Sequence, residues 1–218
     1  MDSMGKVVIV CSLFGVCTLY GVSLLIEPPY VPLNEVAEHE TAFIRTGGTV
    51  TDFSSTESGF IRINIHENNT ELLVFVNTPT MGKKELDLCY GDEIEVEGKV
   101  ELYKGRYEII THIEGIGIRK QTRESNISFV SQIATRPAEY EGTRVSVVGY
   151  VEEIHKRVFY LGDGRYRMRV VVNDRPIPKL SKGDKIIVVS VLVYNAADMR
   201  YDLNLISLKY CNTSPLTT

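Results

Sequence analysis

The sequence lacks the residue patterns on which most enzymes depend. Its four histidines, His39, His66, His112 and His155, lie far apart and form no two-histidine helical motif. No Gly-x-Ser-x-Gly elbow is present, and no glycine-rich phosphate-binding loop precedes a helix. These absences argue against metal-dependent, nucleophilic and nucleotide-hydrolysing catalysis. We therefore expect a protein that is not an enzyme and that has neither a cofactor nor a metal site.

Cysteine is also scarce, with four residues in the chain. Cys11 and Cys17 lie in an apolar N-terminal run, so only Cys89 and Cys211 remain in the rest of the sequence. Neither pair has the spacing of a metal or redox site. A disulfide between Cys89 and Cys211 in an exported protein is one alternative. We favour two unpaired thiols, because sequence alone does not show that their Cα atoms come within reach.

The chain has no excess of basic residues, with 24 Lys and Arg against 28 Asp and Glu. These totals hide a difference in charge between the two halves of the chain. Residues 27–124 carry 10 basic and 18 acidic residues, whereas residues 125–218 carry 13 basic and 9 acidic residues. Such an asymmetry suggests that one half meets an anion.

Charge is absent from residues 7–26, which are mostly apolar. A helix of about 20 such residues can cross a bilayer, so this segment is predicted to be a transmembrane anchor and to make the membrane a partner. A cleaved signal peptide is the alternative, although the run is longer than the usual apolar core and no clear cleavage site follows it. Lys6 before the run and Glu27 after it place the body on the extracytoplasmic side. The proline-rich residues 27–32 then form a stiff spacer.

The remaining sequence contains one module twice. Residues 183–194 repeat the pattern of residues 91–103, in which a Gly-Asp turn begins a long strand. Apolar residues at every second position predict a strand with one buried face. The predicted buried positions are Ile94, Val96, Val100 and Leu102 in the first copy, and Ile186, Val188, Leu192 and Tyr194 in the second.

Each copy is predicted to contain five strands. In the first copy they cover residues 42–53, 59–65, 71–76 and 91–103, and the fifth begins at 107. In the second copy they cover residues 144–153, 157–163, 167–172, 183–194 and 201–203. A charged connector over residues 118–124 and a short helix over 128–133 join the two copies.

The second copy resembles an OB-fold, a five-stranded barrel that binds oligonucleotides and oligosaccharides. The resemblance rests on residues 140–151 as a first strand, on Phe159-Tyr160-Leu161-Gly162-Asp163-Gly164 as a second, and on Gly183-Asp184 at the start of the fourth. It is similar to nucleic-acid-binding OB domains of the anticodon-binding and single-strand-binding type. The first copy keeps Gly48-Thr49-Val50 and Gly91-Asp92. The predicted fold is therefore all-β, with two tandem five-stranded OB-like barrels after one transmembrane helix. The anchor and its flank cover residues 1–29, the first barrel 30–120 and the second 121–218.

The resemblance implies that strands two and three, with the loops after strands one and four, form the binding face. If Phe159 and Leu161 face the core, alternation turns Tyr160 outward, and the same rule turns Arg167 and Arg169 outward. Aromatic rings can stack on bases and cations can neutralise phosphates. The predicted site comprises Lys156, Arg157, Tyr160, Tyr166, Arg167, Arg169, Arg200 and Tyr201. An ordinary solvated strand face is the alternative interpretation of the same residues.

The two copies differ on the outer face of their fourth strand. The first copy carries Glu93, Glu95 and Glu97, which would repel phosphate and are typical of a solubilising face. The second carries Lys185 and two apolar residues there, which predicts that this face is covered, for instance by the first module.

These features predict a membrane-anchored, non-catalytic protein that binds single-stranded nucleic acid through its second barrel. The alternative is an exported adaptor or chaperone whose barrels bind protein, glycan or a cofactor such as haem. Membrane-anchored OB barrels that carry haem share this plan, but here Tyr210-Cys211 is followed by no histidine motif. The two hypotheses therefore remain open at this point.

Overall fold

The computed structural model describes residues 3–23, 27–55, 60–77, 86–121, 126–173, 177 and 179–211. The chain divides into two units, Met1–Tyr30 and Val31–Thr218, and each is considered by itself. The predicted boundary between the two barrels falls inside the second unit, so it stays a prediction.

The first unit contains helix α1, which covers Ser3–Ser23. Its side chains are described from Val7 to Gly21 and are largely exposed, as Phe14 and Leu19 are. Within the described part of the chain, no helix has both the length and the apolar character that a membrane crossing requires. The anchor predicted for residues 7–26 is therefore not supported. The helix is described as far as Ser23, and residues 24–26 of the predicted anchor lie outside the described residues.

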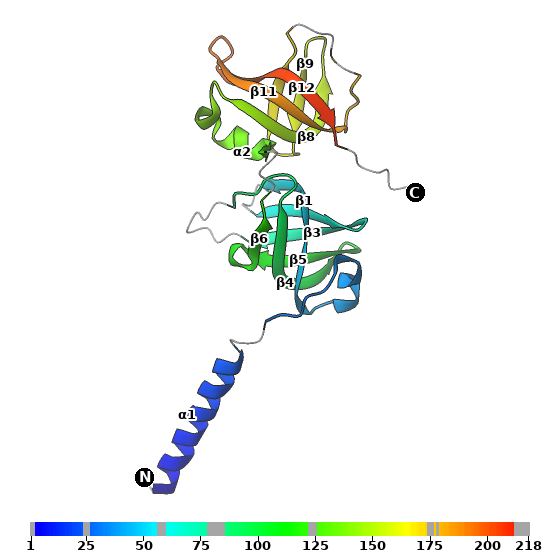
Figure 1. The fold of residues 1–218 in the computed structure, drawn as a ribbon. Coiled ribbons are helices and arrows are strands. Elements are labelled where there is room, and N and C mark those ends of the chain that lie inside the picture. The colour runs from blue at the N-terminus through cyan, green and yellow to red at the C-terminus, as the bar shows by residue number, and fades with distance from the viewer. Residues whose placement is uncertain are drawn as a thin grey trace. The chain divides into compact units, whose positions relative to one another are not determined.

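Five strands of the second unit form the first barrel (Figure 1). They are β1 (Phe43–Ser55), β2 (Ile61–Glu67), β3 (Thr70–Asn77), β4 (Glu93–Tyr103) and β5 (Arg106–His112). Their order is β1-β2-β3-β5-β4, and β4 pairs with β1 to close the barrel. The pairing of β3 with β5 is parallel, and the other pairings among these strands are antiparallel.

The second barrel repeats this topology. Its strands are β8 (Arg144–Ile154), β9 (Val158–Gly162), β10 (Arg167–Val171), β11 (Lys185–Asn195) and β12 (Arg200–Tyr210). Again the third and fifth strands, β10 and β12, run parallel, and β11 closes on β8. Two closed five-stranded barrels with one strand order confirm the predicted tandem OB-like architecture.

Short elements add to each barrel. Strand β6 (Ile116–Lys120) pairs with β4, and β7 (Ile127–Phe129) runs parallel to β8. Helix α2 (Val130–Thr135) follows β7, and 3-10 turns cover Leu33–His39, Ile113–Gly115 and Pro137–Tyr140. The prediction of a connector over residues 118–124 is therefore wrong up to Lys120, and residues 122–125 lie outside the described residues. The predicted helix over 128–133 begins later, because its first residues pair with β8.

Alternating apolar residues form the core of each barrel, as the sequence predicted. Residues of β4 such as Ile94 and Val96, and Ile186 and Val188 of β11, are fully buried. Two predicted core residues are corrected: Leu102 is 48% exposed and Tyr194 is 42% exposed. Leu102 pairs with Tyr107 and Tyr194 pairs with Tyr201, close to the hairpin turns that follow β4 and β11. At these strand ends the side chains lie beyond the barrel core and stay partly exposed.

The first barrel covers the outer face of β11 near the start of the strand. Ile187 packs against the first barrel's core cluster, to which Phe129 of β7 and Val148 of β8 also belong. Backbone atoms join the barrels too, since the Tyr90 amide donates to the Ile127 carbonyl at 3.0 Å. The predicted cover is therefore present at Ile187, whereas Val193 on the same face is 38% exposed.

A polar cluster borders the same contact. Lys185 Nζ lies 2.7 Å from the Thr51 carbonyl oxygen and 3.3 Å from Asp52 Oδ2, and the Tyr150 hydroxyl donates to Asp52 Oδ2 at 2.6 Å. The ammonium also faces the rings of Tyr150 and Tyr90, at 5.1 and 5.9 Å from their centroids. Burial, with Cys211 close by, raises the pKa of Tyr90 to about 12. Burial and the hydrogen bond to Asp52 also raise the pKa of Tyr150.

Candidate nucleic-acid interface

The outer face of the second barrel is organised in rows that cross its strands. Cross-strand pairing places Glu153 of β8 opposite Tyr160 of β9, Tyr160 opposite Arg169 of β10, and Arg169 opposite Asp202 of β12. Phe159, Leu161, Met168 and Val170 point into the core and are buried. The outward orientation predicted for Tyr160, Arg167 and Arg169 is therefore confirmed.

Arg167 and Tyr160 form a stacked pair on this face. The Arg167 guanidinium carbon lies 4.9 Å from the centroid of the Tyr160 ring. Glu153 lies 3.8 Å from the Arg167 guanidinium and 3.1 Å from His155 Nε2. Because the Arg167 side chain is 61% exposed, its ion pair with Glu153 is screened by water and leaves the guanidinium available to a ligand.

Arg169 is held differently, although it lies only two residues further along β10. Its guanidinium is 3.3 Å from Asp202 Oδ2 and 3.4 Å from Asp198 Oδ2, and its side chain is 22% exposed. Arg200 contacts the same carboxylates, at 2.5 Å from Asp198 and 3.4 Å from Asp202. Two arginines therefore face two aspartates, so neither Arg169 nor Arg200 offers a free charge to phosphate.

The hairpin between β11 and β12 builds this ionic cluster. The Asn195 side-chain oxygen accepts hydrogen bonds from the backbone amides of Ala197 and Asp198, which fixes the turn. Its side-chain nitrogen donates to Asp198 Oδ2 at 3.3 Å and to Asp202 Oδ2 at 3.1 Å. Met199 closes the turn with a positive φ of 49°.

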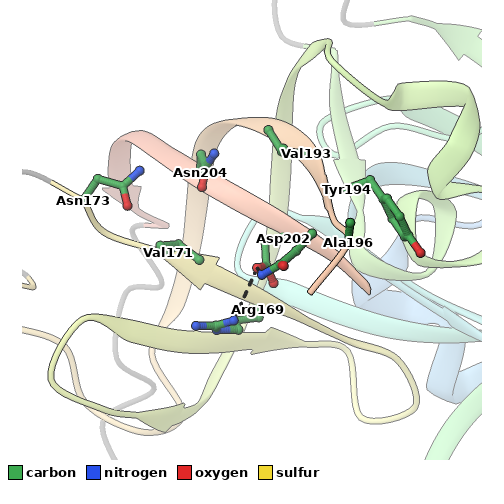
Figure 2. Close-up of a pocket in the computed structure, with 9 residues that line it drawn as sticks. Arg169, Val171, Asn173, Val193, Tyr194, Ala196, Asp202 and Asn204 are labelled. Atoms are coloured by element: carbon green, nitrogen blue, oxygen red, sulfur yellow. Dashed lines mark hydrogen bonds and ion pairs between the residues drawn. The ribbon is translucent and has the colours of Figure 1, made fainter. Parts of the chain in front are cut away.

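A groove of about 460 Å³ lies between β10, β12 and the end of β11 (Figure 2). The lining residues come from the three strands, the hairpin turn and the segment after β10: Arg169, Val171, Asn173, Val193, Tyr194, Asn195, Ala196, Asp202 and Asn204. Figure 2 shows the Arg169 guanidinium and the Asp202 carboxylate joined across the groove. Amide, carboxylate and guanidinium groups thus line one open site.

The loops place the other predicted residues. Lys156 and Arg157 are exposed in the turn between β8 and β9, and no acidic side chain of the described residues pairs with either. Tyr166 packs partly on the barrel core, and the Arg165 guanidinium lies 5.1 Å from its ring centroid. Tyr201 packs against Tyr194, with ring centroids 5.1 Å apart.

The residues predicted from the sequence to form the binding site therefore fall into three groups. Lys156, Arg157, Tyr160 and Arg167 share the outer face and the turn beside it. Arg169 and Arg200 lie in the ionic cluster, and Tyr166 and Tyr201 are partly buried against the barrel. Whether any of them binds nucleic acid stays a prediction.

Sequence reasoning missed the asparagines and aspartates of the groove. Asn195 and Asp198 flank a turn and could have been identified from the preference of such residues for capping backbone amides. Asp202 carried a weaker signal, because a carboxylate inside an apolar strand is unusual but does not reveal its partners.

The acidic row of the first barrel is largely neutralised. Glu95 pairs with Arg45 at 3.0 Å and also with Arg119, and Lys120 lies 3.4 Å from Glu93. Arg119 and Lys120 belong to β6, so the basic connector folds back on the acidic strand. The interpretation of this row as a solubilising face that discourages edge pairing is therefore corrected, because β6 pairs with β4. Among the described residues no cluster of His, Cys, Asp and Glu could hold a metal ion.

Cys89 and Cys211 are half-buried free thiols. Burial, then the nearby Asp92, raises the pKa of Cys89. Burial also raises the pKa of Cys211, although the Tyr90 hydroxyl and Lys185 partly oppose that effect. Neither thiol is activated by these surroundings.

No family model and no curated protein match the sequence. Solved structures match parts of it. The p204 HINb domain is 15% identical and aligns over 79% of this chain and 98% of its own, with a TM-score of 0.34. The telomere capping protein Ten1 from S. pombe is 15% identical over 42% of this chain and 86% of its own, with a TM-score of 0.34.

A putative aspartyl-tRNA synthetase from Leishmania major Friedlin is 10% identical over 44% of this chain, with a TM-score of 0.36. The match spans only 21% of that synthetase. At these identities and TM-scores the likenesses carry no argument. The assignment of the fold rests on the strand order of the two barrels.

Proposed function

We propose that this protein binds single-stranded nucleic acid, without catalysis, through the outer face of its second barrel. The observation that carries the proposal is the stack of Arg167 on Tyr160 beside the exposed cations Lys156 and Arg157. Exposed cations next to an aromatic ring on strands two and three of an OB barrel suit a sugar-phosphate backbone with unstacked bases.

The basic residues of this region fall into two groups, which differ in whether they are already paired with carboxylates. Lys156, Arg157 and Arg167 are available to phosphates. Arg169 and Arg200 are not, because Asp198 and Asp202 already neutralise them. Contact with roughly three phosphates gives a slope of about −2 for the logarithm of the binding constant against that of the salt concentration. The interface is therefore expected to bind weakly, with a binding constant that falls about 16-fold when the salt concentration rises fourfold.

Binding of a labelled single strand to the full chain at several salt concentrations tests the proposal. Lys156→Gln with Arg157→Gln should weaken binding at low salt and reduce the slope by about 1.4, since two phosphate contacts are removed. A matched control replaces Lys104 and Arg106 of the β4–β5 hairpin with Gln, which should leave both quantities unchanged. Absence of binding at low salt, or equal losses in the two double variants, would refute the proposal.

The alternative of an adaptor that binds protein has one observation in its favour. Val193, Tyr194 and Met199 are exposed apolar residues at the β11–β12 hairpin, and Met199 is 81% exposed. A partner that covers them would bind with little dependence on salt, unlike a nucleic acid. The absence of enzymatic activity and the extracytoplasmic location both stay predictions.

A further inference from the structure

His155 lies in the turn between β8 and β9, beside the three cations proposed to contact phosphate. Its backbone amide donates to the Val158 carbonyl at 2.8 Å, which closes the turn. The imidazole packs edge-on against the Tyr160 ring, with the ring centroids 6.1 Å apart. The His155 side chain is 50% exposed, so it can exchange protons with the solvent while it borders the binding face.

One carboxylate is shared between His155 and Arg167. Glu153 Oε1 lies 3.1 Å from His155 Nε2, and Glu153 Oε2 lies 3.8 Å from the Arg167 guanidinium. Glu153 comes from β8 and Arg167 from β10, and the arginine stacks on Tyr160 of β9, the strand between them. A negative charge at this position repels the phosphates that the neighbouring cations attract.

The other charged groups around this turn are two cations and a second carboxylate. Lys156 and Arg157 follow His155 directly and are exposed. Glu152, which precedes the shared carboxylate on β8, lies over Gly162 instead of over the imidazole. The protonation state of His155 therefore changes the charge that phosphates meet at this turn.

We propose that His155 makes strand binding depend on pH: protonation of its imidazole offsets the charge of Glu153, and the face then binds single-stranded nucleic acid more tightly. This inference rests on the proposed function, because it concerns the same cations and the same strand. Histidine is the side chain that ordinarily changes its charge between about pH 5 and 8. The three cations and Glu153 carry a net charge of +2 while the imidazole is neutral and +3 when it is protonated.

The release of counterions gives the size of the effect. One more unit of positive charge corresponds to one more phosphate contact, which steepens the logarithmic dependence of the binding constant on salt by about 0.7 for a single strand. Because such a contact contributes little at about 1 M salt, the binding constant should rise about eightfold at roughly 50 mM salt and about threefold at roughly 200 mM. The effect of pH should therefore shrink as salt is added.

The test measures binding of the full chain to labelled oligothymidine, at about pH 8 and about pH 5.5 in roughly 50 mM salt. Thymine carries no group that titrates in this range, so the strand keeps its charge. The unmodified protein should bind about eightfold more tightly at the lower pH. In His155→Gln this ratio should fall below about twofold, because glutamine is neutral at both pH values. His112→Gln removes an exposed histidine of β5 in the first barrel and, as the matched control, should keep the ratio of the unmodified protein.

A second variant tests the role of the carboxylate without any titration. Glu153→Gln raises the net charge of the face by one, as protonation of His155 does. This variant should therefore bind at about pH 8 as tightly as the unmodified protein binds at about pH 5.5. Glu114→Gln, at an exposed position of the first barrel, is the matched control and should leave binding at that pH unchanged. Both replaced side chains of the site are 50% exposed, so neither substitution is expected to disturb the core.

The outcomes separate this inference from the proposed function. Binding that does not change with pH, a pH effect that survives in His155→Gln, or no tightening in Glu153→Gln overturns the role of His155 and leaves strand binding in place. Absence of binding at both pH values removes the proposed function and this inference with it. A pH effect that is lost in His155→Gln and kept in His112→Gln, together with tighter binding by Glu153→Gln, supports both.

Discussion

Replacing Asp52 with alanine should destabilise the protein far more than replacing an exposed acidic residue. The Lys185 side chain is 10% exposed and that of Asp52 is 23% exposed, with Nζ and Oδ2 3.3 Å apart. Removing one partner of a buried ion pair costs about 3–5 kcal/mol, because the other charge stays in a poorly solvated place. The Thr51 carbonyl still accepts from Lys185, which favours the lower end of that range.

The Tyr150 hydroxyl would also lose its acceptor in Asp52→Ala, at a cost of about 1 kcal/mol. Together these terms give a loss of roughly 3–4 kcal/mol in the free energy of unfolding. Urea denaturation of the full chain measures it. The double variant Asp52→Leu with Lys185→Met should recover much of the loss, because no charge is then buried without a partner.

The matched control is Glu101→Ala. Glu101 pairs with Lys99 at 3.0 Å, but the two side chains are 41% and 52% exposed. Such a pair contributes about 0–1 kcal/mol. If Asp52→Ala were no more destabilising than Glu101→Ala, the argument that Lys185 is held in a water-poor contact between the barrels would be wrong.

Two further predictions concern stability. In Gly98→Ala the new Cβ would lie 2.5 Å from Ile109 Cγ2, so the free energy of unfolding should fall by about 1–3 kcal/mol. In Gly117→Ala the nearest atom to the new Cβ is the Glu95 carbonyl oxygen at 4.0 Å, an ordinary contact, so this variant should change it little; equal urea midpoints would contradict this. Because the pKa values of Tyr90 and Tyr150 are raised on folding, the unfolded chain loses those protons first as the pH rises. The free energy of unfolding should therefore fall from about pH 10 upward, and a flat profile there would exclude such burial.

Much of the fold could be predicted because it depends on local periodicity. Phe159 and Leu161 alternate with outward residues, and this period of two determines which side chains enter the core whatever lies across the barrel. The same alternation correctly turned Tyr160, Arg167 and Arg169 outward. The rule failed at Leu102 and Tyr194, because it does not show where a strand leaves the barrel.

Other parts of the architecture depend on pairings that alternation does not reveal. Strand β6 looked like a charged connector because its basic residues were considered alone, and the acidic residues that they neutralise lie on β4. The contact between the barrels similarly joins Asp52 to Lys185, which are far apart in the chain.

The sequence by itself determined that this chain forms two barrels of one topology and which residues line the outer face of the second. Only the tertiary structure decided which of those residues are available to a ligand. Arg167 and Arg169 are equivalent in the sequence pattern, yet one is exposed and the other is neutralised. The reason is physical: Asp198 and Asp202 reach Arg169 only because β12 pairs in parallel with β10, and that pairing joins residues about thirty positions apart.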